Sequence, residues 1–350
     1  MSTRSQATGT NAQDRMDGAA DPSAMADGAA AGAAGMSAPR GSGGAPAPGA
    51  ARTAARLLRG APLAAAIRAE VAREAEALCA ALGSPPALAV VRVGDDPATA
   101  VYLQRVLENC RQVGIEGRLV ALDADVHPDR VADAVGRLSA DERVAGILVG
   151  QPLPPTIALD AVLRRLDPAK DIDGIHPLSA GMLALGRDGF VPATAEAAVE
   201  ILVRSGIELA GRRAVVVGRS NVVGKPAALL LLRRHATVTI CHSRTADLAA
   251  ETRRAEILIV AAGRPGLVGA DMVAPGAVVV DVGINVIDGR IVGDVDERAA
   301  EVASAITPVP GGVGPLTNAI LLTHLVRAAC AQAGSRGLPL PSRAALEVPA

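Results

Sequence analysis

Short apolar runs that suit buried strands alternate with amphipathic helical segments along most of this 350-residue chain. Strand-like runs span 86–94, 116–122 and 144–150, and segments with helical spacing of apolar residues lie between them at 98–113 and 128–140. Strands separated by helices of this length form parallel βαβ units. The alternation therefore predicts an α/β fold and disfavours an all-β or a purely helical one.

The alternation breaks once, and this break predicts two lobes with a cleft between them. Strand and helix alternate again from "RRAVVVGRS" (212–220) to "GAVVVDVGIN" (276–285), which indicates a Rossmann-type lobe with a parallel sheet. We place the first, substrate-binding lobe at 57–197 and the second lobe at 198–315. A final amphipathic helix at 316–332 is expected to complete the first lobe.

The two ends of the chain differ in composition from the rest. Residues 1–56 contain no Leu, Ile, Val or aromatic residue, and 333–350 are also poor in helical pattern. A segment that cannot bury apolar surface does not offset its ordering entropy. We predict a disordered tail at 1–56 and a loose tail at 333–350. Scattered aspartates in the first tail argue against a transit peptide.

Composition excludes several classes of function. The net charge is −1 and the chain has one Tyr, one Phe and no Trp, so it offers neither a basic surface nor stacking platforms for nucleic acid. Its four cysteines form no C-x-x-C pair, so we expect no metal site. No apolar run is long enough to span a bilayer. We expect a cytoplasmic protein that binds neither membrane nor nucleic acid.

A glycine-bearing turn opens the second lobe. In "VVVGRSNVVGKPAALLLL" (215–232) a hydrophobic strand is followed by Gly218, five residues, Gly224 and a helix. A helix N-terminus with open N–H groups suits a pyrophosphate. The spacing departs from G-x-G-x-x-G, so the turn is compatible with a nucleotide site and with an ordinary strand–helix connection.

The next strand, "TVTICHSRT" (237–245), bears on which cofactor would bind. It ends in Ser243-Arg244 where an NAD site has an acidic residue for the ribose hydroxyl, and Arg219 lies in the first turn. Arginine forks suit a 2′-phosphate, which favours NADP over NAD. The alternative is that both arginines are solvated surface residues. "DVGIN" (281–285) closes a later strand and is placed to contact the nicotinamide end.

Three further sequence segments have compositions that are unusual for an ordinary loop. They are "QPLP" (151–154), "KDIDG" (170–174) and "TPVPGGVGPLT" (307–317). The proline- and glycine-rich third run suits a backbone that approaches a ligand closely before feeding a helix. For "KDIDG" the competing interpretation is a solvated turn, because Asp and Gly are turn formers.

Taken in order, these runs resemble the bifunctional methylenetetrahydrofolate dehydrogenase/methenyltetrahydrofolate cyclohydrolase family. The matching motifs are "VGDDPAT…Y", "PLP", "DPAKDIDG", "GRSNVVGKP", "HSRT", "DVGIN" and "TPVPGGVGPLT", from about Leu57 to Ala331. The resemblance implies an NADP-linked, cytoplasmic homodimer acting on tetrahydrofolate one-carbon derivatives. Its dehydrogenase oxidises the methylene bridge to a methenyl cation, and its cyclohydrolase adds water to give formyltetrahydrofolate.

The resemblance also implies roles for particular residues. Tyr102 would stack on the folate rings, Asp173 would hydrogen-bond the pterin, and Gly311 and Gly312 would line the folate pocket. The cofactor phosphates would be held by Gly218, Arg219 and Ser220, and the nicotinamide would lie near Ile284. The family's "P-C-T-P" run between the lobes is matched by Val191, Pro192 and Thr194, with Ala193 in place of Cys and Ala195 in place of Pro.

Two further departures affect the family's active-site pair. The family places a catalytic lysine four residues after the tyrosine and a glutamine before "x-P-L-P", and here these positions hold Val106 and Gly150. Residues four apart share a helix face, so Val106 is expected beside Tyr102 and Arg105 is expected to point elsewhere. Because valine cannot titrate, we predict that the cyclohydrolase is lost or severely weakened while the dehydrogenase activity survives in part.

Two other interpretations stay open on the sequence alone. The chain could be a catalytically impaired relative that binds folate or NADP, or a dehydrogenase for an altered substrate. Retention of Tyr102, Asp173 and the "PGGVGP" loop favours a pocket that still binds its ligand. Folate titration and turnover assays separate the three.

Overall fold

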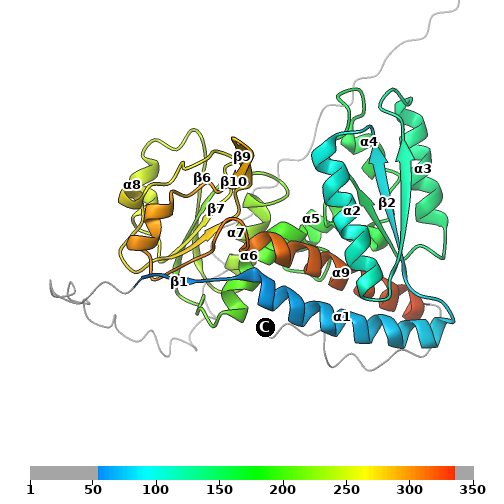
Figure 1. Ribbon diagram of the computed structural model, residues 1–350, viewed down its shortest axis with the longest axis horizontal. Helices are drawn as coiled ribbons and strands as arrows, with labels where there is room; N and C mark the ends of the chain where they lie inside the picture. The colour runs from blue at the N-terminus through cyan, green and yellow to red at the C-terminus, as the bar shows by residue number, and fades with distance from the viewer. Residues whose placement is uncertain (1–53, 336–350) are drawn as a thin grey trace, which may run out of the picture. The chain divides into compact units, whose positions relative to one another are not determined.

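The computed structural model describes residues 54–335 (Figure 1). Residues 1–53 and 336–350 lie outside the described part, and so does most of both predicted tails. The described part contains two parallel sheets, each with helices packed on it. The predicted α/β class with a parallel Rossmann-type sheet is confirmed.

The first sheet has three parallel strands in the order β3-β2-β4. Their bounds are Ala87–Val93 for β2, Glu116–Leu122 for β3 and Gly146–Val149 for β4. Nearly every residue of β2 is buried because helices cover both faces of this central strand, which explains its continuous apolar sequence. The strand β3 at the edge alternates between exposed and half-buried residues.

Seven helical segments precede β5 within the described residues. They are α1 (Gly60–Leu82), α2 (Pro97–Gln112), α3 (Pro128–Ala140), α4 (Leu159–Leu163), the 3-10 turn η1 (Pro168–Lys170), α5 (Pro177–Ala184) and α6 (Ala193–Arg204). The last helix, α9 (Val313–Ser335), packs against both α1 and α6. The two ends of the described chain therefore share one hydrophobic core.

The second sheet has six strands in the order β1-β11-β8-β7-β5-β6, all parallel to their neighbours. The strands are β1 (Arg56–Leu57), β5 (Arg213–Val217), β6 (Thr237–Cys241), β7 (Ile257–Val260), β8 (Val278–Asp281) and β11 (Ala305–Ile306). They are accompanied by α7 (Gly224–Arg233), α8 (Leu248–Thr252) and the 3-10 turns η2 (Ala270–Met272) and η3 (Glu297–Glu301). A small antiparallel hairpin, β9 (Asn285–Ile287) and β10 (Arg290–Val292), follows β8.

Two boundaries differ from the predicted ones. Arg56, assigned to the disordered tail, begins β1 and pairs with Ala305 at the edge of the second sheet. The Arg56 N–H donates to the Ser304 carbonyl at 2.9 Å. Two residues are too few to show a periodicity, so the pattern could not predict this strand. At the other end, 333–335 belong to α9 rather than to a loose tail.

The parallel arrangement brings the carboxyl ends of β5, β6 and β8 to one edge of the second sheet. Ligands of open α/β sheets bind at this edge, where loops leave the strands. The predicted cofactor turn, "HSRT" and "DVGIN" all follow strands at this edge. The fold thus groups the three motifs that the sequence separates by as many as 60 residues.

Candidate functional site

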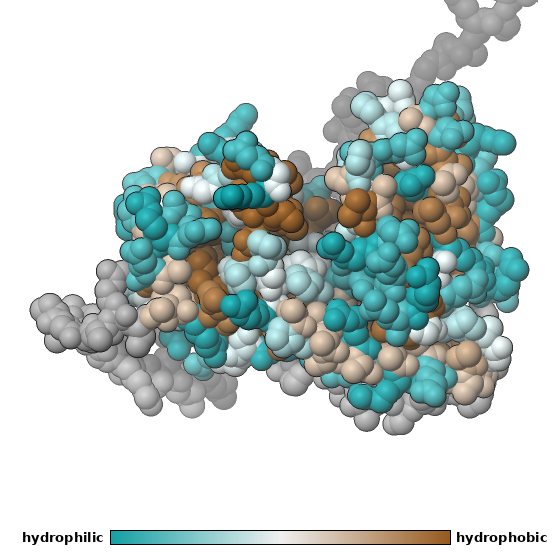
Figure 2. All heavy atoms as spheres, in the orientation of Figure 1, coloured by the Kyte–Doolittle hydropathy of each residue, from teal (hydrophilic) through white to brown (hydrophobic). Residues whose placement is uncertain are grey.

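A cavity of about 480 Å³ brings together residues from the end of β8, the β9–β10 hairpin and the helices α1, α2, α6 and α9. Its lining includes Arg68, Tyr102, Arg105, Asn109, Thr194, Asp281, Val282, Gly283, Ile284, Ile291, the run 308–315, Thr317 and Asn318. Tyr102, Ile284, Gly311 and Gly312, which the resemblance assigns to two different ligands, therefore face one space. Figure 2 shows apolar surface over the β9–β10 hairpin, where Ile284 is 67% exposed.

The helix α2 supplies one wall of this cavity. The Asp96 carboxylate caps the helix by accepting the Thr99 N–H at 2.7 Å, and Pro97 occupies the first turn. From there Tyr102, Arg105 and Asn109 recur at three- and four-residue steps, and all three line the cavity. The face of α2 directed at the cavity is therefore polar.

The adjoining face of α2 is buried, and this corrects one expectation. Leu103, Val106 and Cys110 point into the hydrophobic core, with Val106 only 1% exposed. Arg105, expected to point away from Tyr102, lines the same cavity. A helical turn has 3.6 residues, so i+3 and i+4 flank the direction of residue i on either side. The packing of α2 against the core decides which of these two side chains is buried, and here it is that of Val106.

Gly150, the second departure, lies in equally tight surroundings. Its N–H donates to the Val91 carbonyl at 2.8 Å, and Gly150 does not line the cavity. A Cβ at this position would lie 2.8 Å from Leu103 Cδ1 and 3.2 Å from the Val91 carbonyl oxygen. The space of a longer side chain is thus partly filled by Leu103.

The "KDIDG" loop uses its first two charged residues to hold itself in place. The Lys170 ammonium donates to the carbonyls of Leu138 and Asp141, the latter at 2.8 Å. The Asp171 carboxylate accepts the His176 N–H at 2.8 Å and the Ser179 hydroxyl at 2.7 Å. These contacts exclude the competing interpretation that the whole loop is a solvated turn.

Asp173 has no hydrogen bond within residues 54–335 and differs from its neighbours in this respect. The pKa of its carboxyl is raised to about 7, first by burial and then by the Asp171 charge, while His324 opposes the shift. Tyr102, 38% exposed, has its pKa raised by desolvation and secondarily by the nearby Asp173 charge. Tyr102 is therefore neutral over the working range, whereas Asp173 changes charge near neutrality.

Gly174 completes this corner of the site. Its φ is +67°, and a Cβ would overlap the backbone of Val191 and lie 2.6 Å from the Pro192 nitrogen. Only glycine fits, because both the conformation and the contact forbid a side chain. The loop that carries Asp173 is thereby held against the run that carries Thr194.

His324 is a buried polar residue near the site that the sequence analysis did not single out. It is 0% exposed in α9, with Nδ1 2.8 Å from the Ile172 carbonyl and Nε2 2.9 Å from Glu196 Oε2. The imidazole thus fixes the peptide that precedes Asp173. No local signal marks this role, because its partners lie 152 and 128 residues away in the chain.

The predicted phosphate turn is built from closely packed glycines. The Gly218 N–H donates to the Cys241 carbonyl at 2.8 Å, and its φ is +140°. A Cβ on Gly218 would overlap the Ala261 carbonyl oxygen, and one on Gly224 would overlap that of Gly218. Ser220 Oγ accepts the N–H groups of Val223 and Gly224 at the start of α7. The chain thus approaches the helix N-terminus without side chains in the way.

Two arginines flank this turn. Because Val217 pairs with Cys241, the residues after β5 and β6 leave the sheet side by side, which brings Arg219 near Ser243 and Arg244. Both guanidinium groups are exposed, and within the described residues neither has an acidic partner. A glycine-lined helix N-terminus flanked by arginines that have no acidic partner within residues 54–335 fits a dinucleotide that carries an additional 2′-phosphate.

"DVGIN" is held by a pair of buried carboxylates. The Asp281 carboxylate accepts the N–H groups of Gly283, Asp294 and Val295 at 2.8–3.0 Å. Burial raises the Asp281 pKa to about 6 against the lowering effect of these bonds. Asp294 in turn accepts the Asn285 side-chain amide at 2.8 Å. Asp281 lines the cavity, but the backbone already occupies both of its oxygens.

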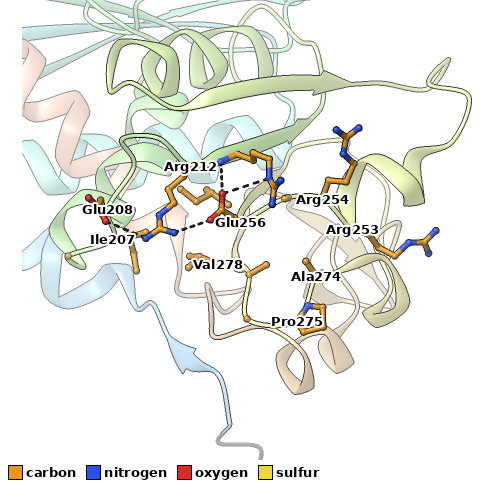
Figure 3. A pocket seen from close by; sticks show the side chains of 15 residues that line it. Ile207, Glu208, Arg212, Arg253, Arg254, Glu256, Ala274, Pro275 and Val278 are labelled. Atoms are coloured by element: carbon orange, nitrogen blue, oxygen red, sulfur yellow. Dashed lines mark hydrogen bonds and ion pairs between the residues drawn. The ribbon is translucent and has the colours of Figure 1, made fainter. Parts of the chain in front are cut away.

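A second cavity, of about 580 Å³, lies at the amino ends of β5, β7 and β8 (Figure 3). Arg212 bridges Glu256 at 2.9 Å and Glu208 at 3.3 Å, so its charge is already compensated. Arg253 and Arg254 point away from this cluster. The amino edge is opposite to the one that carries the glycine turn, so we assign the function to the first cavity.

Residues 54–335 contain neither a metal-binding cluster nor a membrane-spanning helix. No group of three or more His, Cys, Asp or Glu residues in this range is arranged to hold a metal ion. No helix in the same range combines the length and apolar character needed to cross a bilayer.

Two family models match the chain. Residues 58–173 match the catalytic domain, and residues 192–333 match the NAD(P)-binding domain, of tetrahydrofolate dehydrogenase/cyclohydrolase. Bifunctional protein FolD of Chloroflexus aurantiacus is 52% identical over 276 residues, which are 78% of this chain and 97% of that protein. Bifunctional protein FolD 1 of Rubrobacter xylanophilus is 52% identical over 277 residues, covering 79% and 97%.

Solved structures give the same result. The bifunctional FolD enzyme of Campylobacter jejuni superposes with a TM-score of 0.77 at 42% identity, covering 79% of this chain and 99% of that one. The Trypanosoma brucei enzyme, solved with NADP and an inhibitor, superposes with a TM-score of 0.75 at 36% identity, covering 79% and 98%. The similarity covers both sheets and the cavity.

Proposed function

The chain belongs to the tetrahydrofolate dehydrogenase/cyclohydrolase family, and we propose that it oxidises methylenetetrahydrofolate to methenyltetrahydrofolate with NADP. We further propose that its cyclohydrolase step, which would yield formyltetrahydrofolate, is lost or severely weakened. The observation that carries the first part is the shared cavity of Tyr102 and Ile284. Hydride transfer requires chiefly that the two reacting rings be held in contact.

Each wall of the cavity has a role in this proposal. Tyr102 stacks on the folate rings, and Gly311 and Gly312 let the backbone approach them. Asp173 is not part of this lining, but its charge acts on Tyr102. Its carboxylate, which has no hydrogen-bond partner within residues 54–335, accepts hydrogen bonds from the pterin N–H groups. Ile284 supports the nicotinamide face. Every one of these groups binds or orients, and none of them exchanges a proton during hydride transfer.

The cofactor contacts follow from the glycine turn and the two strand ends. Gly218, Arg219 and Ser220 hold the phosphates, and Ser243 and Arg244 bind the 2′-phosphate. NADP supplies the hydride acceptor when it is bound. Selectivity for NADP over NAD therefore rests on side chains that are exposed and unpaired in the described part of the chain.

The weakened hydrolysis follows from the ionisable groups around the cavity. Water addition needs a group that takes or polarises a proton. Tyr102 stays neutral, the Asp173 carboxylate is engaged by the pterin in this proposal, the Asp281 oxygens accept backbone N–H groups, and the arginines of the lining can only donate. Val106 and Gly150 occupy the family's lysine and glutamine positions and supply neither function.

Arg244→Ala is expected to raise KM for NADP about tenfold to 30-fold while changing KM for NAD less than about twofold. A hydrogen bond to a charged group contributes about 1.5–3 kcal/mol, and only NADP carries the phosphate that makes it. Initial rates of methylenetetrahydrofolate oxidation with each cofactor measure both constants. Arg187→Ala, an exposed arginine outside the strand-end turns, is the control. An equal rise in KM for NADP and for NAD would contradict the assignment of Arg244.

The domain division stays a proposal. We propose that 57–197 with α9 forms the folate-binding domain and that 198–315 forms the NADP-binding domain. The packing of α9 against α1 and α6 supports this division. The homodimer and the cytoplasmic location implied by the family stay predictions, as do the expected absence of nucleic-acid and membrane partners.

A further inference from the structure

Two arginine side chains in the cavity have no counter-charge within residues 54–335. We propose that Arg68 and Arg105 form a subsite for the carboxylates of the glutamyl tail of the folate substrate. The inference rests on the proposed function, because a reduced folate consists of a pterin, an aminobenzoate and a glutamate with two carboxylates. Arg105 is the residue that the helical spacing had predicted to point away from the ligand.

The placement of the two residues supports a joint site. Arg68 is half-buried on α1 and Arg105 is exposed on α2, and both line the same cavity. Within residues 54–335 neither guanidinium forms a hydrogen bond or an ion pair. Guanidinium groups on protein surfaces generally find a carboxylate when one is near, so two unpaired ones in one cavity indicate an anionic ligand.

The charges of the cavity lining favour the same conclusion. Asp281 is the one carboxylate in that lining, and its oxygens accept backbone N–H groups at the end of β8. It is therefore not available to neutralise Arg68 or Arg105. Two guanidinium cations that face the same cavity raise its electrostatic potential, and their repulsion is unfavourable. A tail with two carboxylates relieves this repulsion.

The order of groups along α2 matches the order of groups in the substrate. Arg105 follows Tyr102 by three residues, a separation at which side chains on a helix are neighbours, about 5–6 Å apart at Cβ. If Tyr102 stacks on the aromatic part, the glutamate that extends from it reaches the next turn of α2. The cofactor phosphates are the other anions to consider, but their proposed ligands, Gly218, Arg219 and Ser220, are outside this lining.

Equilibrium binding tests this subsite without relying on turnover. Calorimetric Kd values are measured on the full chain for tetrahydrofolate and for tetrahydropteroate, which lacks the glutamate. We expect wild type to bind tetrahydrofolate about tenfold or more tightly than tetrahydropteroate. This ratio should fall to about threefold in Arg68→Gln or Arg105→Gln and to near one in the double variant. Arg111→Gln, also exposed on α2 but outside the cavity, should keep the wild-type ratio.

Three results would overturn the subsite. The first is a wild-type affinity ratio near one, and the second is a ratio that the double variant retains. The third is that the variants lose affinity for NADP while the ratio stays unchanged. The last result would assign the arginines to a cofactor phosphate. A separate assay of NADP reduction by wild type tests the proposed function. If the ratio behaves as expected and no reduction occurs, the proposed function fails while the tail subsite stands.

Discussion

Asp173→Asn is expected to lower kcat/KM for methylenetetrahydrofolate oxidation about 100-fold and to stabilise the protein above pH 7. The loss follows because the Asp173 carboxylate, which has no partner among residues 54–335, is proposed to accept pterin N–H groups. Two hydrogen bonds to a charged acceptor account for a factor of about this size. An amide keeps the shape but presents one donor where the pterin requires an acceptor.

The same residue predicts a pH profile. The pKa of Asp173 is raised to about 7, mainly by burial, and pterin binding needs the ionised form. Wild-type kcat/KM should therefore rise as pH passes through about 7 and reach a plateau above it, since kcat/KM reports groups of the free enzyme. Asp173→Asn should flatten this rise. Asp125→Asn, an exposed aspartate in a loop, should keep the wild-type profile.

The stability change has the opposite sign to that of a salt-bridged acid. Between pH 4 and 7 the folded protein keeps the Asp173 proton that the unfolded chain releases, so stability falls as pH rises through this window. Above pH 7 the cost of the buried charge stays constant. Asp173→Asn removes this cost, so urea denaturation should show a gain of about 2 kcal/mol at pH 8 and almost none at pH 4. A loss of stability at pH 8 would contradict this assignment of the pKa.

The double variant Val106→Lys, Gly150→Gln is expected to gain hydrolysis of methenyltetrahydrofolate by about 100-fold over wild type. A positioned group that takes part in proton transfer contributes a factor of this order. Val106 borders the Tyr102 face of α2, and a lysine stem is long enough to carry its ammonium past Arg105 to the cavity. Formyl product formed from added methenyltetrahydrofolate measures the gain.

The same double variant is expected to be less stable than wild type. Val106 is buried in the core, and a side chain at Gly150 requires Leu103 to move. We expect the free energy of unfolding to fall by about 3 kcal/mol, as for other overpacked or polar core substitutions. Val106→Met with Gly150→Gln is the matched control, because it has similar bulk and no ammonium. A folded double variant that hydrolyses no faster than this control would contradict the role assigned to the missing lysine.

The sequence predicted the fold well where elements are long and periodic. The bounds expected for 116–122 and 128–140 coincide with those of β3 and α3. The two-residue strand β1 could not be predicted, because its pairing with β11 depends on a segment 249 residues further along the chain. Local periodicity contains no information about such a partner.

The site was predictable in its motifs but not in its side-chain directions. The "PGGVGP" run and "DVGIN" identified walls of the cavity, because close backbone approach and turn chemistry leave a local signature. Whether Arg105 or Val106 faces the ligand depends on how α2 packs on the core, and the i+4 rule alone gave the wrong answer. His324 depends on Ile172 and Glu196, which are remote in sequence.

The separation of the two activities is tested most directly by a two-step assay of the purified chain. Methylenetetrahydrofolate and NADP are supplied, and NADPH, methenyl and formyl products are followed together. We predict that NADPH forms, and that methenyltetrahydrofolate accumulates and hydrolyses no faster than it does in buffer. Formyltetrahydrofolate appearing at the rate of NADPH formation would contradict the proposed loss of cyclohydrolase activity at Val106 and Gly150.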